Sequence, residues 1–415
     1  MKRTTIILLN LRFSDFYSDE LFRRVKEVHQ VRFVAVLDQH FKDRIGNHVL
    51  PYLDKIYSLN AESKDGFLAE FNFNQLCEIV ENEMDQTDEV KIICTDEFNL
   101  LHAGHLRKKY NLSGNTDLDM IAFRDKVKMK DILKDAGVRV PRFQFLKAED
   151  SFVGLSNAIG LPFVIKPIDS CGSFGVYIIK NEADYLKFYN ESENATTKFE
   201  VEEYIEGNLY HVDSCMQNNK ITFISANEYS CPNHDYTKGK SLGSIPLDER
   251  SDLAQSLTGF ARRALIALGS KNLINHMEIF VTNDNELVFL EVSARPPGGM
   301  INFIYPINHS INLMDMDFFM QSDLTVELPK NEKKENAFWV MFPLMSGKIN
   351  KFNTPSVKSR YELTSFRKVG DIVLPEECNS IVGKMAHAVF YHKDKNILRQ
   401  DFEYMRTFNL VEMAE

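Results

Sequence analysis

Glu278 and Glu291 lie on either side of an expected β-turn, at positions that would face each other across a hairpin. The stretch LINHMEIFVTNDNELVFLEVSAR, residues 273–295, contains two apolar runs separated by NDNE. Asn and Asp at such a point favour a tight β-hairpin turn. If the turn is centred on Asp284-Asn285, then Glu278 and Glu291 lie directly opposite each other. The alternative is a register shifted by two residues, in which the glutamates are unrelated surface residues.

Two opposed glutamates need a positive partner between them. Cross-strand Cβ atoms are about 5 Å apart, and like charges at that distance are destabilising. A proton on one carboxylate would relieve the repulsion, and a divalent cation between both would relieve it better. Mg²⁺ typically binds one or two carboxylates together with substrate phosphate oxygens. The hairpin therefore favours a metal site. Ser293 and His276 are expected on the same face, with His276 packed or hydrogen-bonded rather than a ligand.

An arginine and two glycines follow the second strand. Arg295 is expected on the same face, where its planar guanidinium would suit phosphate or carboxylate oxygens. Pro296-Pro297 stiffens the chain, and Gly298-Gly299 lets backbone amides approach an anion closely. The alternative is an exposed arginine before an ordinary turn.

Two lysines and a glycine-containing loop indicate an anion site in the middle of the chain. Lys166 ends the apolar strand FVIK and precedes DSCGSFG, residues 169–175. Lys126 lies early in the preceding expected helix. Gly172 and Gly175 flank the small Ser173, so the loop amides could fold over phosphate groups. The loop lacks the pattern of a P-loop, and either lysine alone is more often a solvated side chain.

Strand and helix patterns must position these residues. In residues 1–112 the runs TTIILLN, VRFVAVLD and VKIICTD alternate with stretches whose apolar residues have helical spacing. This alternation predicts a doubly wound parallel sheet. No G-x-G-x-x-G turn is present, so we interpret this part as support for the site rather than as a dinucleotide site. Further along, a charged stretch at 325–336 is expected to cross the surface.

The composition restricts the class of protein. Its 415 residues exceed what one hydrophobic core usually serves, so roughly two to four domains are expected. A net charge of −10 leaves no basic footprint for nucleic acid or anionic lipid. Six scattered cysteines without a C-x-x-C pair favour reduced thiols. The opening MKRTTIILLNL is expected to be a buried strand rather than a signal peptide, and no run approaches the ~18 apolar residues of a membrane span. A cytoplasmic protein is expected.

Five stretches in this order resemble the ATP-grasp superfamily: RDKVKMKDILKDAGVRVP, LPFVIKPIDSCGSFGV, VEEYIEGNLYHVD, HMEIF and LEVSARPPGG. The resemblance covers residues 113–300 well and implies an α/β (α+β) fold of four parts. These are a Rossmann-like pre-grasp domain at 1–112, a central subdomain with a small mobile lid at 113–200, a catalytic lobe on an antiparallel sheet at 201–330, and a C-terminal extension at 331–415. ATP and Mg²⁺, or Mn²⁺ in its place, are the implied cofactors.

The resemblance also implies which residues bind the nucleotide. Lys126 and Lys166 match the two lysines that hold ATP phosphates. The mobile phosphate-covering loop is matched by Ser170 to Val176, including Gly172, Ser173, Phe174 and Gly175. The hinge that reads the adenine edge is matched by Glu202 and the backbone of Glu203, Tyr204 and Ile205. The ribose and nucleotide contacts fall near Glu206, His211 and Asp213.

Metal and catalytic residues are implied in the same way. Glu278 and Glu291 match the magnesium carboxylates, and Ser293 stands where the family usually has a metal-ligating asparagine. Arg295 matches the arginine that contacts the transferred phosphoryl group and the substrate carboxylate. Together with the Gly298-Gly299 amides, it is expected to stabilise an oxyanion.

The pattern looks most like the L-amino-acid ligases, which join a carboxylate to an amine. Carboxylation is disfavoured because Pro296 to Met300 contain no acid where biotin carboxylases have a glutamate. The implied substrates are a small carboxylate and a small amine, joined through an acyl phosphate, and a homodimer is a further expectation. Two alternatives stay open: ligation onto a peptide or protein terminus, and a nucleotide-binding module without turnover. Within residues 231–246, His234, Lys238 and Lys240 either face an acceptor's carboxylate or belong to a solvated loop.

Overall fold

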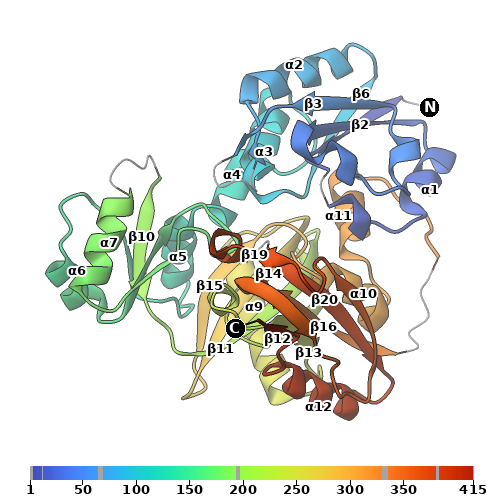
Figure 1. Ribbon diagram of the computed structural model, residues 1–415. Helices are drawn as coiled ribbons and strands as arrows, with labels where there is room; N and C mark the ends of the chain where they lie inside the picture. Colours follow the sequence, from blue (N-terminus) through green and yellow to red (C-terminus); the bar gives the residue numbers. More distant parts are fainter. Residues whose placement is uncertain are drawn as a thin grey trace.

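The chain folds into an N-terminal sheet with helices, a lobe that projects to one side, and a large central sheet (Figure 1). The computed structural model describes residues 3–11, 13–63, 69–192, 197–329, 335–379 and 383–414. Within these ranges no helix is long and apolar enough to cross a membrane. All six cysteines are free thiols.

The N-terminal part is a parallel sheet, as the alternation of strands and helices predicts. Its strand order is β3-β2-β1-β6, and each ladder is parallel. The first strand is buried along its whole length. The elements are β1 (Thr4–Leu9), α1 (Leu21–Val28), β2 (Val31–Asp38), β3 (Lys55–Leu59), α2 (Phe73–Met84), β6 (Glu89–Cys94) and α3 (Leu100–Lys109), with a short β4 (Glu62–Ser63) and β5 (Ala69–Glu70) pair.

A helix from much later in the chain covers one face of this sheet. In α11 (Leu313–Ser322), Met314 and Phe318 belong to the same apolar cluster as Phe22 and Phe33. The Gln321 side chain accepts a hydrogen bond from the Cys94 backbone N–H at 3.0 Å and donates to the Cys94 carbonyl at 3.1 Å. This long-range helix joins the N-terminal part to the central sheet, and local sequence patterns did not predict it.

The projecting lobe is a small antiparallel sheet with its own core. Its strand order is β7-β10-β8-β9, and Phe163, Ile165 and Val201 lie at the centre of its apolar cluster. Its elements are β7 (Phe143–Phe145), α6 (Phe152–Ile159), β8 (Phe163–Pro167), β9 (Tyr177–Ile179), α7 (Glu182–Ser192) and β10 (Phe199–Glu203). The preceding helices α4 (Asp117–Met120) and α5 (Lys126–Asp135) pack in the core of the central sheet instead.

The central sheet has eight antiparallel strands in the order β15-β14-β11-β12-β13-β16-β20-β18. Because β13 pairs with β16, residues on both sides of the expected boundary at 330/331 share one sheet. The strands are β11 (Gly207–Gln217), β12 (Lys220–Tyr229), β13 (Leu242–Pro246), β14 (Leu273–Thr282), β15 (Leu287–Ser293), β16 (Asn336–Pro343), β18 (Arg360–Ser365) and β20 (Lys384–His392). Part of the expected surface crossing at 325–336 lies outside the described residues.

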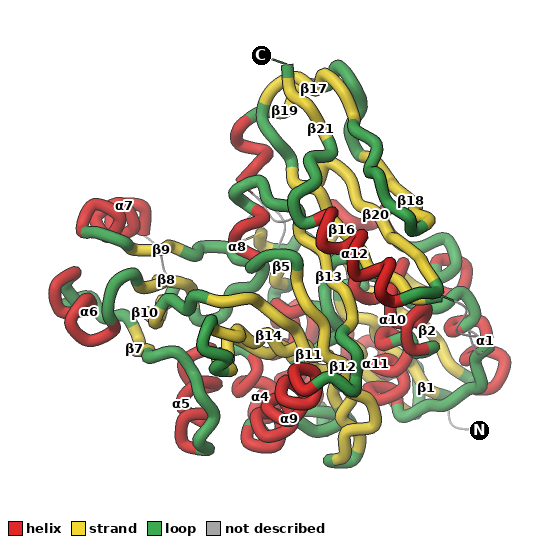
Figure 2. Tube along the Cα trace, turned by 90° about the horizontal axis from the view of Figure 1, so that it is seen from below, coloured by secondary structure: helices red, strands yellow, loops and turns green. Residues whose placement is uncertain are grey.

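Helices cover both faces of the central sheet. One face packs against α9 (Asp252–Ala267), whose Leu257 and Phe260 contact the core that contains Val212. The other face packs against α10 (Ile301–His309) through Ile304 and Tyr305. The remaining elements are α8 (Asn233–Tyr236), β17 (Gly347–Phe352), β19 (Ile372–Val373), α12 (Lys395–Met405) and β21 (Val411–Met413). Figure 2, seen from below, shows α12 beside β16 and β20.

Candidate active site

A cavity of about 1320 Å³ lies between the N-terminal sheet, the lobe and the central sheet. Three of the residues predicted for the site, Gly175, His211 and Asp213, do not line it. The predicted residues that do line it are Lys126, Lys166, Ser170, Gly172, Ser173, Phe174, Val176, Glu202, Glu203, Tyr204, Ile205, Glu206, Glu278, Glu291, Ser293, Arg295, Gly298 and Gly299. Residues far apart in the sequence therefore converge on one cavity.

The hairpin brings Glu278 opposite Glu291, although not by the turn predicted. Thr282 and Glu286 close a three-residue loop, in which Asn285 has a φ of 61°. This loop alone would pair Glu278 with Leu290. A bulge between Glu278 and Ile279 shifts the register by one residue. Glu278 therefore pairs with Glu291, and His276 pairs with Ser293. The opposition was thus predicted correctly, but the register depends on the bulge, which only the fold reveals.

The surroundings of the two glutamates fit a divalent cation. Glu278 is 5 % exposed, and its Oε1 accepts hydrogen bonds from Asn233 Nδ2 at 2.7 Å and from the Tyr229 hydroxyl at 3.2 Å. Glu291 lies on the neighbouring strand, with its Oε2 3.3 Å from Lys126 Nζ. The Ser293 Oγ is buried beside the cavity and has no hydrogen-bond partner among the described residues. A donor set of two carboxylates and one hydroxyl suits Mg²⁺ or Mn²⁺.

His211, Asp213 and His276 form a hydrogen-bonded cluster next to Glu278. Asp213 accepts hydrogen bonds from His211 at 2.8 Å and from His276 at 2.6 Å, and His211 also contacts Ser244 at 2.6 Å. The ligand atoms of His211, Asp213 and His276 lie close enough together to hold an ion. However, each nitrogen of both rings already has a protein partner. We therefore interpret the cluster as a hydrogen-bonded support that orients His276 against Glu278.

His211 differs from its expected placement. Its side chain has no exposed surface and does not line the cavity. This placement argues against the nucleotide contact that the family resemblance implies, and it assigns His211 to the supporting network.

The phosphate end of the cavity is built around Lys126. Asp125 caps α5 by accepting hydrogen bonds from the Val127 and Lys128 amides at 3.0 and 3.1 Å, which places Lys126 in the first turn. The Lys126 ammonium donates to the Ser170 carbonyl and lies beside Glu291. Lys126 thus connects the loop that is predicted to cover phosphate with Glu291, a predicted metal ligand.

The loop itself depends on glycine. Gly172, Ser173 and Gly175 have φ values of 65°, 60° and 68°, in the left-handed region that glycine adopts without strain. A Cβ at Gly175 would also lie 2.9 Å from Pro167 Cγ. Gly175 therefore shapes the loop without lining the cavity.

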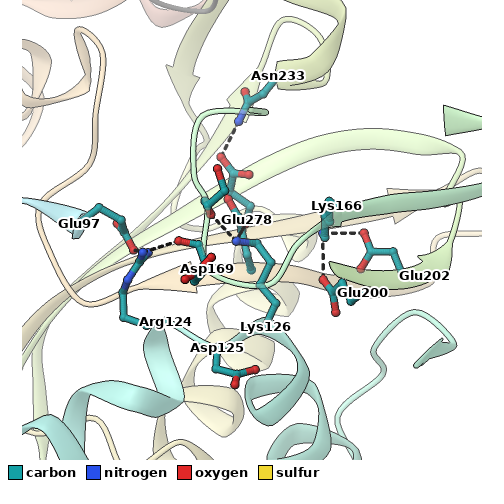
Figure 3. Close-up of polar contacts among 12 residues, drawn as sticks. Glu97, Arg124, Asp125, Lys126, Lys166, Asp169, Glu200, Glu202, Asn233 and Glu278 are labelled. Carbon is teal, nitrogen blue, oxygen red and sulfur yellow. Dashed lines mark hydrogen bonds and ion pairs between the residues drawn. The ribbon is translucent and has the colours of Figure 1, made fainter. Parts of the chain in front are cut away.

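Lys166 belongs to a buried array of two lysines and two glutamates. Its Nζ lies 2.6 Å from Glu202 Oε1 and 3.7 Å from Glu200 Oε1 (Figure 3). Lys130 Nζ lies 2.6 Å from Glu200 and 2.5 Å from Glu202. Burial alone would raise the pKa of Glu202, but Lys130 and Lys166 overcome it and lower that pKa to about 2. The formal charges of the array sum to zero. Lys130, which the sequence analysis did not identify, therefore compensates part of the charge of Glu200 and Glu202, so that Lys166 is not their only counter-charge.

Lys130→Met should lower both the thermal stability and the affinity for ATP. Removing one partner of a buried ion pair costs about 3–5 kcal/mol, and an uncompensated Glu200 would draw the ammonium of Lys166 away from phosphate. The measurements are the unfolding temperature and ATP titration calorimetry, with Lys128→Met on the exposed face of the same helix as control. Adding Glu200→Gln restores neutrality, so the double variant should regain most of the ATP affinity. A double variant weaker than Lys130→Met would contradict charge balance as the cause.

The predicted hinge lies at the end of β10. Residues 204–206 are in neither β10 nor β11, and all three line the cavity, so their backbone groups are placed to contact a ligand edge. The Glu203 carboxylate accepts a hydrogen bond from the Arg142 amide at 3.0 Å and lies 3.2 Å from Arg139 Nη2. Its charge is therefore already paired within the protein.

Arg295 is held by a residue of the N-terminal part. Glu97 accepts from Arg295 Nε through one oxygen and from Arg124 Nη1 at 2.6 Å through the other. Burial would raise the pKa of Glu97, but Arg295 and Arg124 together lower it to about 2. Sequence reasoning missed Glu97 and Arg124. A signal for Glu97 was its place just after β6, because ligand sites of parallel sheets lie at the carboxyl ends of strands.

The segment 231–246 reaches the cavity beside Glu278. Asn233 on α8 contacts Glu278, and His234 and Lys240 line the cavity, whereas Lys238 does not. Lys238 and Lys240 both contact Asp235, at 3.1 and 2.8 Å. Part of the segment thus faces the cavity, but its two lysines share a carboxylate.

Comparisons with known proteins agree with this geometry. Residues 159–303 match the family model of the ATP-grasp domain. The chain is 23% identical over 302 residues to an L-arginine-specific L-amino acid ligase of Bacillus subtilis, covering 70% of this chain and 72% of that protein. It is 26% identical over 195 residues to a D-alanine–D-alanine ligase of Oceanobacillus iheyensis, and spans about half of that protein, 52%.

Solved structures share the whole fold. An L-amino acid ligase from Bacillus licheniformis superposes with a TM-score of 0.71 at 15% identity, over 100% of both chains. An N5-carboxyaminoimidazole synthetase from Staphylococcus aureus, complexed with ADP, superposes with a TM-score of 0.65 at 16% identity, over 98% of both chains. The chain therefore has the ATP-grasp fold, as predicted. Residues 159–303 match the ATP-grasp domain, and the resemblance to an L-amino acid ligase extends over most of the chain.

Proposed function

We propose that this ligase joins the carboxylate of an amino acid to the amine of an amino acid or a small peptide-like amine, converting ATP to ADP and phosphate. The observation that supports it best is the convergence of Glu278, Glu291 and Arg295 on the cavity that Lys126 and Lys166 also line. The Bacillus subtilis relative is an L-arginine-specific L-amino acid ligase. We propose that this protein also acts on amino acids, but we do not propose that it prefers arginine.

In the first step, an oxygen of the substrate carboxylate attacks the γ-phosphorus of ATP, and ADP leaves. Lys126, Lys166 and the amides of residues 170–175 offset the phosphate charge and align the reacting atoms. Glu278, Glu291 and the Ser293 hydroxyl would hold Mg²⁺, which supplies further neutralisation of phosphate charge. The product of this step is an acyl phosphate.

In the second step, the nitrogen of the amine attacks the acyl carbon, loses a proton, and phosphate leaves. The guanidinium of Arg295 and the amides of Gly298-Gly299 are placed to stabilise the oxyanion that forms. Glu97 holds that guanidinium in place through its Nε. Closure of the loop at 170–176 over the nucleotide would exclude water, which would otherwise hydrolyse the acyl phosphate.

The test is ADP release measured across pairs of amino acids, with peptides and bicarbonate as further acceptors or carboxylates. Release that requires both an amino-acid carboxylate and an amine, with an amide product seen by mass spectrometry, is the expected result. Release only with a peptide would favour ligation onto a peptide terminus, and release with bicarbonate alone would favour carboxylation. ATP binding without release under any condition would overturn the proposal. Sedimentation analysis tests the predicted homodimer separately.

A further inference from the structure

The part of the cavity wall formed by residues 366–387 contains a lysine, Lys384, that has no carboxylate partner among the described residues. Lys384 begins β20, is partly buried and lines the cavity. Its ammonium lies 4.7 Å from the centre of the Phe366 ring, and no carboxylate among the described residues lies within ion-pair distance of it. Other cations of the same wall are paired: Arg367 contacts Glu377, and Lys240 contacts Asp235. Burial lowers the pKa of Lys384, as expected of an ammonium that lacks a counter-charge.

A bulge places His387 on the same face as Lys384. In a regular strand, residues three apart point to opposite faces. Here Pro343 pairs with Lys384 and Phe342 with Ala386, so one extra residue of β20 lies between these pairs. Both side chains consequently line the cavity, and the Phe366 ring contacts both, with its centroid 5.3 Å from that of His387. Bulges of this kind often re-aim a side chain beside an active site.

Buried polar atoms around this wall have no partner in the described part of the chain. They are the Nδ1 atoms of His387 and His234 and the Nε1 of Trp339. Buried polar groups are nearly always hydrogen-bonded, so these atoms indicate a polar ligand. Tryptophan and lysine can only donate hydrogen bonds, and a ligand that satisfies both must carry acceptor oxygens. A carboxylate has the required charge and the required acceptors.

This wall is close to the reacting end of the cavity. At one side, Asn233 of α8 contacts Glu278, and at the other, the Tyr236 hydroxyl donates to the Gly383 carbonyl at 3.0 Å. Four helical residues span only about 6 Å. Trp339 also lies beside the catalytic turn, because a Cβ at Gly299 would be 3.6 Å from its ring. Glu278, Trp339 and Lys384 thus line one cavity, and a ligand bound beside Glu278 could extend towards Lys384.

We propose that Lys384 and His387, with Phe366 as an aromatic wall, bind the carboxylate of the amine substrate. This inference rests on the proposed ligase function. It restricts the second substrate to amines that carry their own acid group, such as amino acids, rather than simple amines. Lys126 and Lys166 are not available for this role, because the proposed function assigns them to the phosphates of ATP.

The test compares an amino acid with its carboxamide as the amine substrate. The amide keeps the size and the nucleophilic nitrogen but removes the charge. We expect the wild type to have a KM about 10- to 100-fold lower for the acid, the range that one charged hydrogen bond provides. Lys384→Met should raise the KM for the acid to that for the amide while leaving kcat and the affinity for ATP nearly unchanged. Lys384→Arg should retain much of the discrimination.

Lys348→Met, an exposed lysine on the neighbouring β17, is the matched control. Titration of the acid into enzyme saturated with a non-hydrolysable ATP analogue gives the same comparison without turnover, and the unfolding temperature reports on folding. A Lys384→Met enzyme that is folded, makes product and keeps the wild-type preference for the acid would overturn the inference. Absence of product from every pair in the wild type would instead overturn the ligase proposal itself.

Discussion

Replacing Glu291 with glutamine should reduce turnover about a thousandfold while the fold stays intact. The substitution keeps the size of the side chain and removes one of the two charges that would hold the metal. Metal ions contribute several kcal/mol of charge stabilisation in such reactions, and each 1.36 kcal/mol is a factor of ten in rate. Because the Glu291 side chain is 31% exposed, its neutralisation should change the unfolding temperature little.

The measurement is ADP release as a function of Mg²⁺ concentration, together with Mn²⁺ binding followed by electron paramagnetic resonance. Glu286→Gln, at the tip of the same hairpin and 52% exposed, is the control and should behave as the wild type. Mn²⁺ binding should weaken at least tenfold in Glu291→Gln. Wild-type kinetics and Mn²⁺ affinity in that variant would show that the two glutamates hold no metal.

Replacing Arg295 with methionine should lower kcat about 100- to 1000-fold, the loss typical of one oxyanion-stabilising donor. Arg295→Lys should recover only part of this, since an ammonium lacks the planar set of donors that also contacts Glu97. Single-turnover measurement of ADP and product formation shows which step is slowed. Arg263→Met, exposed on α9, is the control. Unchanged rates in Arg295→Met would remove the guanidinium from the mechanism.

The same variant should lose stability through Glu97. A carboxyl pKa lowered in the folded state stabilises the protein above the unfolded pKa, and that contribution is lost as the pH falls through the folded value. For Glu97 the window runs from its ordinary pKa of about 4.3 down to about 2. Without Arg295, only part of the effect of burial is offset, and the pKa of Glu97 in the folded protein rises. Arg295→Met should therefore unfold at a lower temperature at pH 7, and its acid transition should lie at a higher pH.

Several parts of the site were predictable because local patterns encode them. Lys166 was predicted at the end of a short apolar strand, and in the structure this strand ends one residue later, at Pro167. Asp125 and Lys126 begin a helix whose cap is visible in the sequence. The opposition of Glu278 and Glu291 was also predicted, yet the predicted turn was wrong, because Asn285 adopts a left-handed conformation in a longer loop and a bulge restores the register.

Other parts of the site could not be read locally. Glu97 and Arg295 are far apart in the chain. They meet because α11 packs against both the N-terminal sheet and the central sheet and so joins the two. The family resemblance implies a nucleotide contact near His211, but the tertiary structure buries this residue in a hydrogen-bonded network.

The sequence alone determined which elements form and which of them carry charged residues at their ends, because apolar periodicity and capping act over a few residues. Only the tertiary structure decided which of those charges neutralise one another. Lys166 is paired with Glu202, whereas Lys384 has no carboxylate partner among the described residues. The physical reason is that pairing of buried charges depends on distance and desolvation between segments remote in the chain. Two lysines that look alike in the sequence therefore have different partners in the fold.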